Sequence, residues 1–381
     1  MNKFDQIVVG GGIIGCTIAC ELRKAKQKVA VVERSVPGSE ASVAAAGMLA
    51  PHAGPLLRTP FFNLLRESLA LYPQFVQEVE GETGLETEFR NSGLFYLAFD
   101  EEDEKALAEK MDWQEKSGVE AEWVAGEHIR KKEPSVGRNV RKGLYFPEDC
   151  QIDNIKLVNA IGQWAKKLGV EFILGSPATK IWMEEDHLRG IITGREKIES
   201  PVVINAAGSW ADFDRSLPFE IPIKPARGQI LVLKHHHPLF KHMLYTRRIY
   251  VVNREDGRMI VGSTVESVGY DKNVTVKGLY KLLRGLVEIN PELGFLSFQQ
   301  CWAGLRPRSK DNLPILSKSP IEGLFLATGH FRNGILLAPL TARLICQLVL
   351  GKKLSYDLTR FEIARFLNQK KDKTYPSKKV V

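Results

Sequence analysis

The 381-residue sequence predicts an α/β protein of two domains, and three observations lead to that prediction. A strand, a glycine-rich turn, a helix and a second strand follow one another within residues 6–33. Apolar strands that end in small residues recur at 202–208 and 324–329, so pieces of one domain occur at the start, middle and end of the chain. The stretch 223–301 is rich in strands, which predicts a separate sheet.

The first strand and helix enclose a G-x-G-x-x-G motif, Gly10 to Gly15, in the setting that a dinucleotide-binding fingerprint requires. Gly10 makes the tight turn, Gly12 lets the backbone approach a pyrophosphate, and Gly15 lets the helix pack close to the strand. The helix N-terminus offers free N–H groups to the phosphates. Glu33 ends the second strand, where a carboxylate can accept both ribose hydroxyls and disfavours the 2′-phosphate of NADP. The motif therefore predicts a Rossmann-like domain; the alternative is a glycine-rich turn without a ligand.

Beyond Glu33 the pattern leaves that of an NAD dehydrogenase, which would continue as βαβαβ. A loop of small residues, 39–52, follows instead, and its tiny side chains let the backbone lie against a flat ligand. Hydrophobic periodicity then predicts helices at 61–79, 102–117, 127–133, 154–168 and 334–350. It predicts strands at 93–98, 170–174, 178–183, 188–193, 197–200, 229–233, 249–253 and 258–263.

The order of these elements predicts the domain limits. Segments 1–60, 145–222 and 302–366 form the nucleotide-binding domain, and segments 61–144 and 223–301 form a substrate domain of β-sheet covered by helices. We expect the ligand to lie between the two domains. Residues 367–381 contain five lysines and one acid, which predicts a basic, disordered tail.

The composition is typical of a soluble globular protein, with 44% hydrophobic and 26% charged residues. No apolar run reaches the ~18 residues of a membrane span, and the N-terminus passes directly into a strand, which argues against a signal peptide. Half of the net charge of +8 comes from the tail, so the charge does not indicate nucleic-acid binding. The run His235-His236-His237 lacks an acidic or cysteine partner at metal-ligand spacing, so no metal site is expected.

The five cysteines are odd in number and scattered, which indicates reduced thiols. Cys16 and Cys20 lie one turn apart on the first helix, where packing needs small apolar side chains. The alternative for this pair is a redox or metal-binding role.

Three later features place polar side chains in apolar surroundings. Tyr250 lies on a strand, Arg306 lies between Leu305 and Pro307, and Arg332 stands near the start of the last long helix. An arginine in such a setting can bind a carboxylate through two parallel hydrogen bonds, and a helix N-terminus can stabilise the negative charge of a reduced flavin. Each feature has a structural alternative: a half-buried strand tyrosine, a salt bridge and an ordinary helix start.

Five segments together resemble the FAD-dependent D-amino-acid oxidase family: GGGIIG at 10–15, SVAAAGM at 42–48, NAAGSW at 205–210, WAGLRP at 302–307 and GHFRNGILL at 329–337. Within that family the chain resembles the glycine oxidases of bacterial thiamine biosynthesis. The likeness covers the chain up to the tail that begins at Gln369. It implies noncovalently bound FAD, because Cys301 is interpreted as a core residue and not as a link to the flavin.

The resemblance also implies which residues form the site. Arg306 and Tyr250 would hold the substrate carboxylate, with Arg332 nearby, and residues 50–53 would shape the entrance. FAD would be bound by Gly10, Gly12, Ile13, Ile14, Gly15, Glu33, Arg34, Ala41, Ser42, Ala46, Gly47, Met48, Ala178, His330, Phe331, Arg332, Asn333, Gly334, Ile335 and Leu336. Members of the family transfer a hydride from the substrate Cα to the flavin, so no residue is expected to act as an acid or base.

The implied reaction is the oxygen-dependent oxidative deamination of glycine and of small amines such as sarcosine and D-alanine. Its products are a 2-oxo acid, ammonia and hydrogen peroxide, and the glycine imine would supply thiamine thiazole synthesis. Two departures put a strict preference for glycine in doubt: Val265 stands where glycine oxidases carry methionine, and Arg248 replaces a histidine.

Two other functions stay open at this point. The first is an FAD-dependent D-amino-acid dehydrogenase that passes electrons to a quinone, and the second is a non-catalytic flavin-binding subunit. The expected partners are a small amino acid or amine and oxygen, without nucleic acid. The resemblance further implies a homo-oligomer, such as a tetramer.

Overall fold

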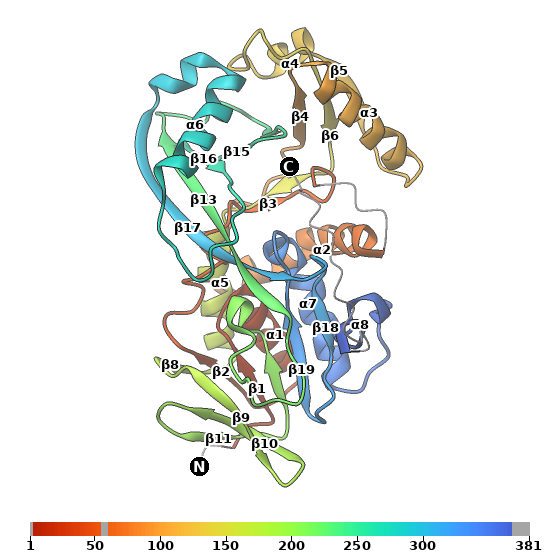
Figure 1. Cartoon of the computed structure of the whole chain (residues 1–381), viewed down its shortest axis with the longest axis vertical. Helices are drawn as coiled ribbons and strands as arrows, with labels where there is room; N and C mark the ends of the chain where they lie inside the picture. The colour runs from red at the N-terminus through yellow and green to blue at the C-terminus, as the bar shows by residue number, and fades with distance from the viewer. Residues whose placement is uncertain (1–2, 55–59, 368–381) are drawn as a thin grey trace.

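The computed structural model describes residues 3–54 and 60–367. Figure 1 shows two regions stacked along the long axis of the molecule, each built on its own large β-sheet. The predicted α/β class is confirmed. Residues 368–381, nearly all of the predicted tail, lie outside the described part of the chain.

The lower region in Figure 1 contains a six-stranded sheet in the order β18-β19-β12-β1-β2-β8. Five of its strands run parallel and are rich in Val, Ile and Leu, as expected for a parallel sheet that is covered on both faces. The sixth, β18, pairs antiparallel with β19. The strands are β1 (Gln6–Val9), β2 (Val29–Glu33), β8 (Glu171–Leu174), β12 (Val203–Asn205), β18 (Ile315–Lys318) and β19 (Leu324–Thr328).

Two different layers cover the faces of this sheet. Helices α1 (Ile13–Lys24), α5 (Asn154–Lys167) and α7 (Gly334–Val349) share a hydrophobic core with side chains of one face. On the other face lies a three-stranded sheet in the order β11-β10-β9. Its strands are β9 (Ala178–Glu184), β10 (His187–Thr193) and β11 (Lys197–Glu199).

Helix α2 (Pro60–Thr83) corrects the predicted domain limits, which assign 61–144 to the substrate domain. Its buried residues, among them Leu64 and Tyr72, pack in the same core as α1, α5 and α7. The Tyr72 hydroxyl donates to the carbonyl of Ile335 at 2.5 Å, at the start of α7. The apolar stripe of α2 is visible in the sequence, but its partner is set only by the tertiary fold.

The upper region contains an eight-stranded sheet in the order β17-β13-β16-β15-β14-β4-β6-β5. Neighbours are antiparallel except β14 and β4, which run parallel. Helices α3 (Glu101–Glu115), α4 (Gly126–Lys132) and α6 (Val276–Ile289) accompany this sheet (Figure 1). The strands are β4 (Leu94–Ala98), β5 (Glu122–Ala125), β6 (Lys142–Phe146), β13 (Ile223–Lys234), β14 (Met243–Tyr245), β15 (Tyr250–Asn253), β16 (Arg258–Gly262) and β17 (Ser297–Ser309).

The long strands β13 and β17 run from the upper region into the lower one (Figure 1). The predicted domain boundary at 301/302 falls inside β17, so the WAGLRP segment belongs to a strand of the eight-stranded sheet. A short ladder of β3 (Met48–Leu49) with β7 (Cys150–Gln151) lies between the two large sheets (Figure 1). The remaining domain limits stay a prediction.

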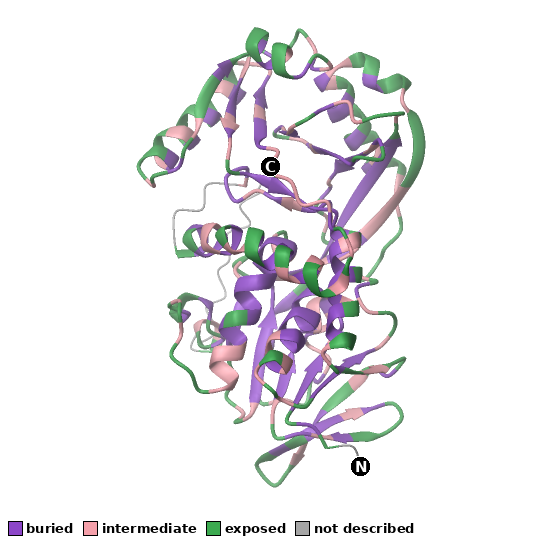
Figure 2. Ribbon diagram, turned by 180° about the vertical axis from the view of Figure 1, so that it is seen from behind, coloured by how far each residue is buried: buried purple, intermediate pink, exposed green. Residues whose placement is uncertain are grey.

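Every predicted helix and strand has a counterpart, although β13 begins six residues before the predicted strand 229–233. The additions are α6, β3, β5, β6, β7, β14, β17 and β18. The remaining short elements are η1 (Gly208–Trp210), η2 (Pro291–Phe295), η3 (Thr359–Phe361) and α8 (Ala364–Leu367). Figure 2 shows burial concentrated in the central strands and in the faces of the helices that cover them. None of the described helices has the length and hydropathy to cross a membrane.

Candidate active site

The glycine turn after β1 has the close contacts that its motif predicts. Gly10 has φ +104°, and a Cβ added there would lie 2.5 Å from the carbonyl oxygen of Ala206. A Cβ on Gly15 would lie 2.0 Å from the carbonyl oxygen of Gly10, so α1 can approach the turn only with glycine at this position. Gly12 is different, because its added Cβ would meet only the Ser42 hydroxyl at 3.3 Å. Gly10 and Gly15 are therefore required for packing, whereas Gly12 faces open space.

The polar groups around this turn already contact one another. Glu33 accepts hydrogen bonds from the backbone amides of Gly11 at 2.7 Å and Ser35 at 2.9 Å. The Ser42 hydroxyl accepts from the amide of Ile13 at 3.0 Å, at the start of α1. The guanidinium of Arg34 lies 3.5 Å from the ring centroid of Trp210. A dinucleotide would therefore meet a preformed set of donors and acceptors.

Buried polar side chains hold the small-residue loop 41–48 from behind. Asn154 donates its amide to the carbonyls of Ser42 at 2.9 Å and Val43 at 3.1 Å. Arg254 donates to the carbonyl of Ala46 at 2.8 Å and is fully buried. Gly47 has φ +72°, and an added Cβ would lie 1.9 Å from a backbone oxygen of Ile152. Ala41 and Met48 lie at the two ends of this loop, and Met48 begins β3.

The segment before α7 carries the other predicted cofactor residues. His330 is buried, its Nε2 lies 3.1 Å from the Thr341 hydroxyl, and burial lowers its pKa to about 3, so it is a neutral structural residue at ordinary pH. Phe331 has φ +50°, and the exposed Arg332 lies 5.3 Å from its ring centroid. The helix starts at Gly334, two residues later than Arg332, with Asn333 at the N-cap.

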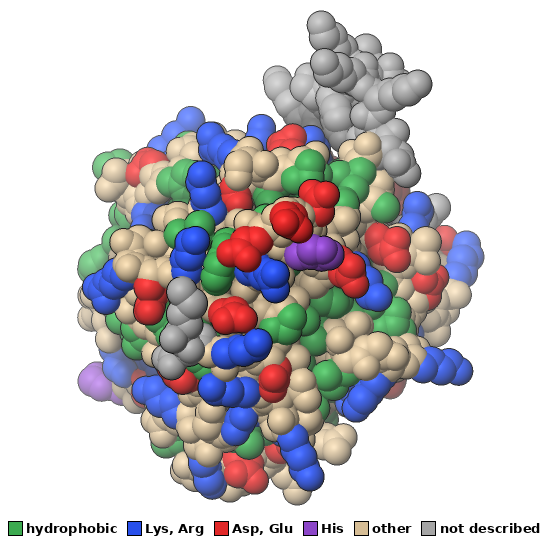
Figure 3. All heavy atoms as spheres, turned by 90° about the horizontal axis from the view of Figure 1, so that it is seen from below, with side chains coloured by type: hydrophobic (Ala, Val, Ile, Leu, Met, Phe, Trp, Pro, Cys, Tyr) green, Lys and Arg blue, Asp and Glu red, His purple; other side chains and the backbone are tan. Residues whose placement is uncertain are grey.

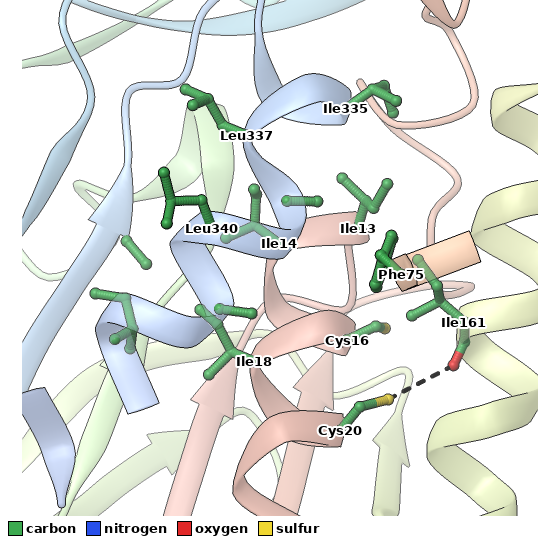
Figure 4. Packing of buried hydrophobic residues seen from close by; sticks show 14 of the residues in the cluster. Ile13, Ile14, Cys16, Ile18, Cys20, Phe75, Ile161, Ile335, Leu337 and Leu340 are labelled. Atoms are coloured by element: carbon green, nitrogen blue, oxygen red, sulfur yellow. Dashed lines mark hydrogen bonds between the residues drawn. The ribbon is translucent and has the colours of Figure 1, made fainter. Parts of the chain in front are cut away.

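Neither N-cap residue of α1 and α7 makes a side-chain capping bond within the described part of the chain, although the Ser42 hydroxyl accepts from the Ile13 amide of α1. The N-cap of α1 is Gly12, and neither helix has an acid in its first turn. Figure 4 shows Ile13, Ile14, Ile335 and Leu337 close together where the two helices pack. Uncapped N–H groups and the helix dipole attract negative charge.

Figure 4 also shows the side chains of Cys16 and Cys20 on the face of α1 turned toward Ile161 of α5. The Cys20 Sγ lies 4.0 Å from the Ile161 carbonyl oxygen. Burial raises the pKa of Cys16 to about 12. Both thiols are packing residues of the core.

Arg306 and Tyr250 meet on one face of the eight-stranded sheet, over two glycines. An added Cβ on Gly228 would lie 2.0 Å from Nη1 of Arg306, and one on Gly262 would lie 2.2 Å from the Tyr250 ring. Arg306 donates to the Thr264 carbonyl at 3.1 Å and to the Ser263 hydroxyl at 2.5 Å. These contacts fix one side of the guanidinium, and no carboxylate among the described residues pairs with it. The predicted structural salt bridge is therefore excluded for the described part of the chain.

The charges around Arg306 favour an anionic ligand. Burial lowers the pKa of Arg306, the Tyr250 hydroxyl opposes this shift, and the nearby Arg332 adds to it. The two arginines repel each other across a partly buried site, so a carboxylate bound between them would stabilise both positive charges.

Tyr245 is a third member of this group, and the sequence analysis does not include it. Its ring stacks at 6.4 Å from that of Tyr250 and meets Tyr96 edge-on at 4.8 Å. Burial raises its pKa, and Arg332 and Arg306 oppose that shift. Only the hydrophobic residues around the three-residue strand β14 mark it in the sequence, and that pattern does not separate it from a core tyrosine.

One sequence expectation for the pocket changes. Arg248 forms an ion pair with Glu288 of α6, so its charge is neutralised there and it does not add charge beside the substrate. Val265, which follows Thr264 in the sequence, is 37% exposed. Cys301 is half-buried on β17, directly before Trp302 in the sequence.

The predicted entrance, residues 50–53, and the following Gly54 rest on a buried ionic cluster. His52 Nδ1 lies 2.6 Å from Asp149 Oδ1, and both side chains are buried. Lys110 of α3 donates to the Gly54 carbonyl at 2.5 Å, and burial lowers its pKa to about 8. The sequence gives no signal for this cluster, because its members are far apart along the chain.

These residues fit a flavin dinucleotide. Gly12 leaves room for a pyrophosphate at the N-terminus of α1, beside the Ser42 hydroxyl, and Glu33 stands at the ribose position of the fingerprint. Ala178 at the start of β9 follows Ser176, whose amide bonds to the Glu33 carbonyl at 3.2 Å, so it lies beside the adenosine position. Helix α7 starts near Arg332 and the Arg306 group.

Comparison with known proteins agrees with this fit. Residues 5–348 match the family described as FAD dependent oxidoreductase, DAO. The bifunctional protein ThiO/ThiG of Synechocystis sp. is 36% identical over 371 residues, 95% of this chain and 54% of its own length, so the chain spans about half of that relative. The hydrogen cyanide synthase subunit HcnC of Pseudomonas protegens is 30% identical over 96% of this chain and 97% of its own.

A solved structure is similar over the whole described fold. The glycine oxidase from Geobacillus kaustophilus superimposes with a TM-score of 0.92 at 29% identity, covering 96% of this chain and 99% of its own. The family match over residues 5–348 includes the glycine turn, the strand of Arg306 and all but the last residue of α7. The chain belongs to the DAO family of FAD-dependent oxidoreductases.

Proposed function

We propose that this enzyme oxidises glycine and other small amines, such as sarcosine and D-alanine, with oxygen as the electron acceptor. Glycine or D-alanine, oxygen and water give a 2-oxo acid, ammonia and hydrogen peroxide, and with sarcosine methylamine is released in place of ammonia. The observation that carries the proposal is the pair Arg306 and Tyr250 on one sheet face, with Arg332 beside them and no carboxylate partner among the described residues.

Arg306 binds the substrate carboxylate, and Tyr250 donates its hydroxyl to the same group. Arg306 is already oriented by Ser263 and Thr264, so little freedom is lost when the substrate binds. Arg332 is exposed and adds positive charge on the open side. A carboxylate fixed in this way leaves the Cα and the amine as the variable part of the substrate.

The residues that would hold FAD fall into three groups: the turn Gly10–Gly15 with Glu33 and Arg34, the loop of Ala41, Ser42 and Ala46–Met48, and the segment His330–Leu336 with Ala178. When bound, FAD supplies an acceptor for the hydride that leaves the substrate Cα. The protein's part is to orient Cα and to keep the amine neutral. The described cluster of Arg306, Tyr250 and Tyr245 needs no acid or base for that task.

The pocket favours small substrates because aromatic side chains enclose it. Tyr96, Tyr245 and Tyr250 form a continuous row from β4 to β15. Val265, which is exposed, leaves space for a methyl group. We therefore expect glycine, sarcosine and D-alanine to react and D-phenylalanine to react poorly.

Supply of the glycine imine for thiamine thiazole synthesis is part of the proposal, and the name ThiO/ThiG of the Synechocystis relative supports it. We further propose that the enzyme is cytoplasmic and homo-oligomeric. The name hydrogen cyanide synthase subunit of a second relative supports a different candidate, a flavoprotein that works as the subunit of a larger enzyme. The other candidate is an FAD-dependent dehydrogenase that passes electrons to a quinone.

A substrate panel tests the proposal. Peroxide formation is measured with glycine, sarcosine, D-alanine, L-alanine and D-phenylalanine, and flavin bleaching with the same amines under argon. Bleaching and peroxide from the first three support it. Bleaching without oxygen uptake points to the dehydrogenase, and no bleaching by any amine in an FAD-loaded protein contradicts amine oxidation altogether. Acid precipitation should release the FAD into the supernatant, and flavin retained in the pellet would contradict noncovalent binding.

A further inference from the structure

Exposed apolar side chains concentrate on one part of the surface. Among the described residues, nine of the fourteen large apolar side chains that are exposed lie between 265 and 298. Val276 is 86% exposed, Tyr280 63% and Phe295 85%. Apolar groups gathered in this way on a folded domain mark a surface that contacts something other than water. The centre of the concentration is α6, at the upper end of the molecule in Figure 1.

Helix α6 has two apolar stripes. Leu282, Leu286 and Ile289 are buried against the eight-stranded sheet and account for the fold of the helix. A second stripe points away from the sheet and consists of Val276, Tyr280, Leu283 and Val287, spaced four, three and four residues apart. Phe295, in η2 directly after the helix, continues the exposed apolar surface at its C-terminal end. The second stripe contributes nothing to the core.

The flank of the exposed stripe is basic. Lys277, Lys281 and Arg284 are exposed on α6, and none forms an ion pair with another described residue. Glu288, the acid of the helix, is already neutralised by Arg248. The contrast is clear at the opposite end of the molecule, where Figure 3 shows basic and acidic side chains intermixed.

We propose that α6 docks the enzyme onto an anionic membrane surface, with Tyr280, Leu283 and Val287 entering the interface and Lys277, Lys281 and Arg284 facing the lipid headgroups. An apolar helix face with lysine and arginine beside it is the combination that binds such surfaces. A second copy of this chain is a poorer occupant when the two α6 helices pack antiparallel, because that arrangement brings their basic flanks together. The proposal is independent of the amine that the enzyme oxidises.

Vesicle binding tests the proposal with the full-length FAD-loaded enzyme. The protein is sedimented with vesicles that contain phosphatidylglycerol and, in parallel, with vesicles of phosphatidylcholine alone. We expect binding to the anionic vesicles that weakens as salt is added, and little binding to the neutral ones. Each lysine or arginine near an anionic surface strengthens binding about fivefold, so Lys277→Gln/Lys281→Gln/Arg284→Gln should lower the affinity on the order of 100-fold.

Matched variants separate this surface from general stickiness. Tyr280→Glu/Leu283→Glu should abolish vesicle binding without changing turnover in solution, because both side chains are exposed and lie outside the substrate site. Ile155→Glu, exposed at the first turn of α5, should bind as the unchanged enzyme does. Removing three exposed lysines elsewhere, with Lys26→Gln/Lys131→Gln/Lys353→Gln, should have a smaller effect than the α6 triple change.

Three results would overturn the proposal. The first is the absence of binding to phosphatidylglycerol vesicles. The second is binding that survives the α6 changes but disappears when the five lysines of residues 370–379 are changed to glutamine, which would assign it to the tail. The third is a change of particle mass in light scattering when α6 is altered, together with no vesicle binding by the unchanged enzyme or any variant. That result would make the exposed face of α6 a contact between protein chains.

Discussion

Arg306 fits against its sheet only because the strand beside it carries Gly228. Any side chain there would enter the space of the guanidinium, since an added Cβ lies 2.0 Å from Nη1. Gly262 likewise leaves space for the Tyr250 ring, which a side chain at this position would enter. The two polar side chains that the motifs predict are thus joined by two small residues that no motif marks.

The first prediction concerns the carboxylate site. Arg306→Ala should weaken binding of a carboxylate ligand by about 2–4 kcal/mol, because the ligand loses its charge partner in a partly buried site. Tyr250→Phe should cost about 1 kcal/mol, the worth of one hydrogen bond. The measurement is a titration of the flavin spectrum, with Arg308→Ala, on the same strand but bonded to Asn312, as control. Normal affinity in Arg306→Ala at full FAD content would move the pocket elsewhere.

Arg254 is the residue that links the substrate strand to the cofactor loop. It follows β15, which carries Tyr250, and donates to the Ala46 carbonyl at 2.8 Å and to Asn154 Oδ1 at 3.2 Å. Its Nε lies 3.4 Å from Asp153. Burial lowers its pKa to about 10, which leaves it charged at physiological pH.

The second prediction follows from these contacts. Arg254→Met should lower the free energy of unfolding by about 3 kcal/mol, because it leaves Asp153 and the Ala46 carbonyl with fewer partners in the interior. The loop should also hold FAD less tightly. Unfolding curves and FAD release are compared with those of Arg258→Met, which loses a contact at 3.1 Å to the same Asp153 but none to the loop. Equal FAD release from both variants would contradict the role of Arg254 in holding the cofactor loop.

At the scale of elements, the start of α1 must meet two requirements: close packing against the first strand and space for a ligand. Gly15 must be glycine for packing, whereas Gly12 has space in the protein alone. The same motif therefore contains one position that the fold needs and one that the ligand needs.

The third prediction separates these two positions. Gly15→Ala should destabilise the fold by about 1–3 kcal/mol, since its Cβ would collide with the Gly10 carbonyl. Gly12→Val should leave the fold intact and give a colourless protein, because the new side chain occupies the place of the pyrophosphate. Circular dichroism and the absorbance of the purified proteins report the two effects. A yellow Gly12→Val protein would show that the nucleotide lies elsewhere.

At the scale of the whole molecule, the entrance residues 50–53 and the following Gly54 connect the two regions. Gln114 of α3 donates to the His52 carbonyl at 3.0 Å, and Lys110 reaches Gly54 from the same helix. Because α3 accompanies the eight-stranded sheet, these bonds tie that region to the chain that leaves the cofactor loop.

The fourth prediction uses the pKa of Lys110. Burial lowers it from the usual 10.5 to about 8, so between those pH values the unfolded chain binds a proton that the folded one does not. Stability therefore rises with pH across this window, by roughly 3 kcal/mol relative to Lys110→Met. Denaturant unfolding of both proteins from pH 7 to 11 measures the difference, with Lys116→Met, exposed on the same helix, as the control. A constant difference would mean that Lys110 is not desolvated.

The sequence by itself determined the parts of this protein whose geometry depends on neighbours along the chain. Gly10–Gly15 between a strand and a helix requires a tight turn and an open helix end, and Glu33 follows at the end of the next strand. Periodicity likewise predicted α5 and α7 within a residue or two of their limits. The position of Arg306 between two apolar neighbours was enough to predict an arginine in an apolar setting.

Only the tertiary structure decided which side chains meet across long stretches of sequence. Tyr245 looks like an ordinary strand residue until β14 brings it beside Tyr250 and Arg306. Arg254 stands next to a hairpin turn, which predicts an exposed residue, yet its guanidinium is buried against a loop about 200 residues earlier in the sequence. Hydrophobic patterns show that a face is buried and not what covers it, so only the tertiary structure shows that α2 packs in the core of the other region.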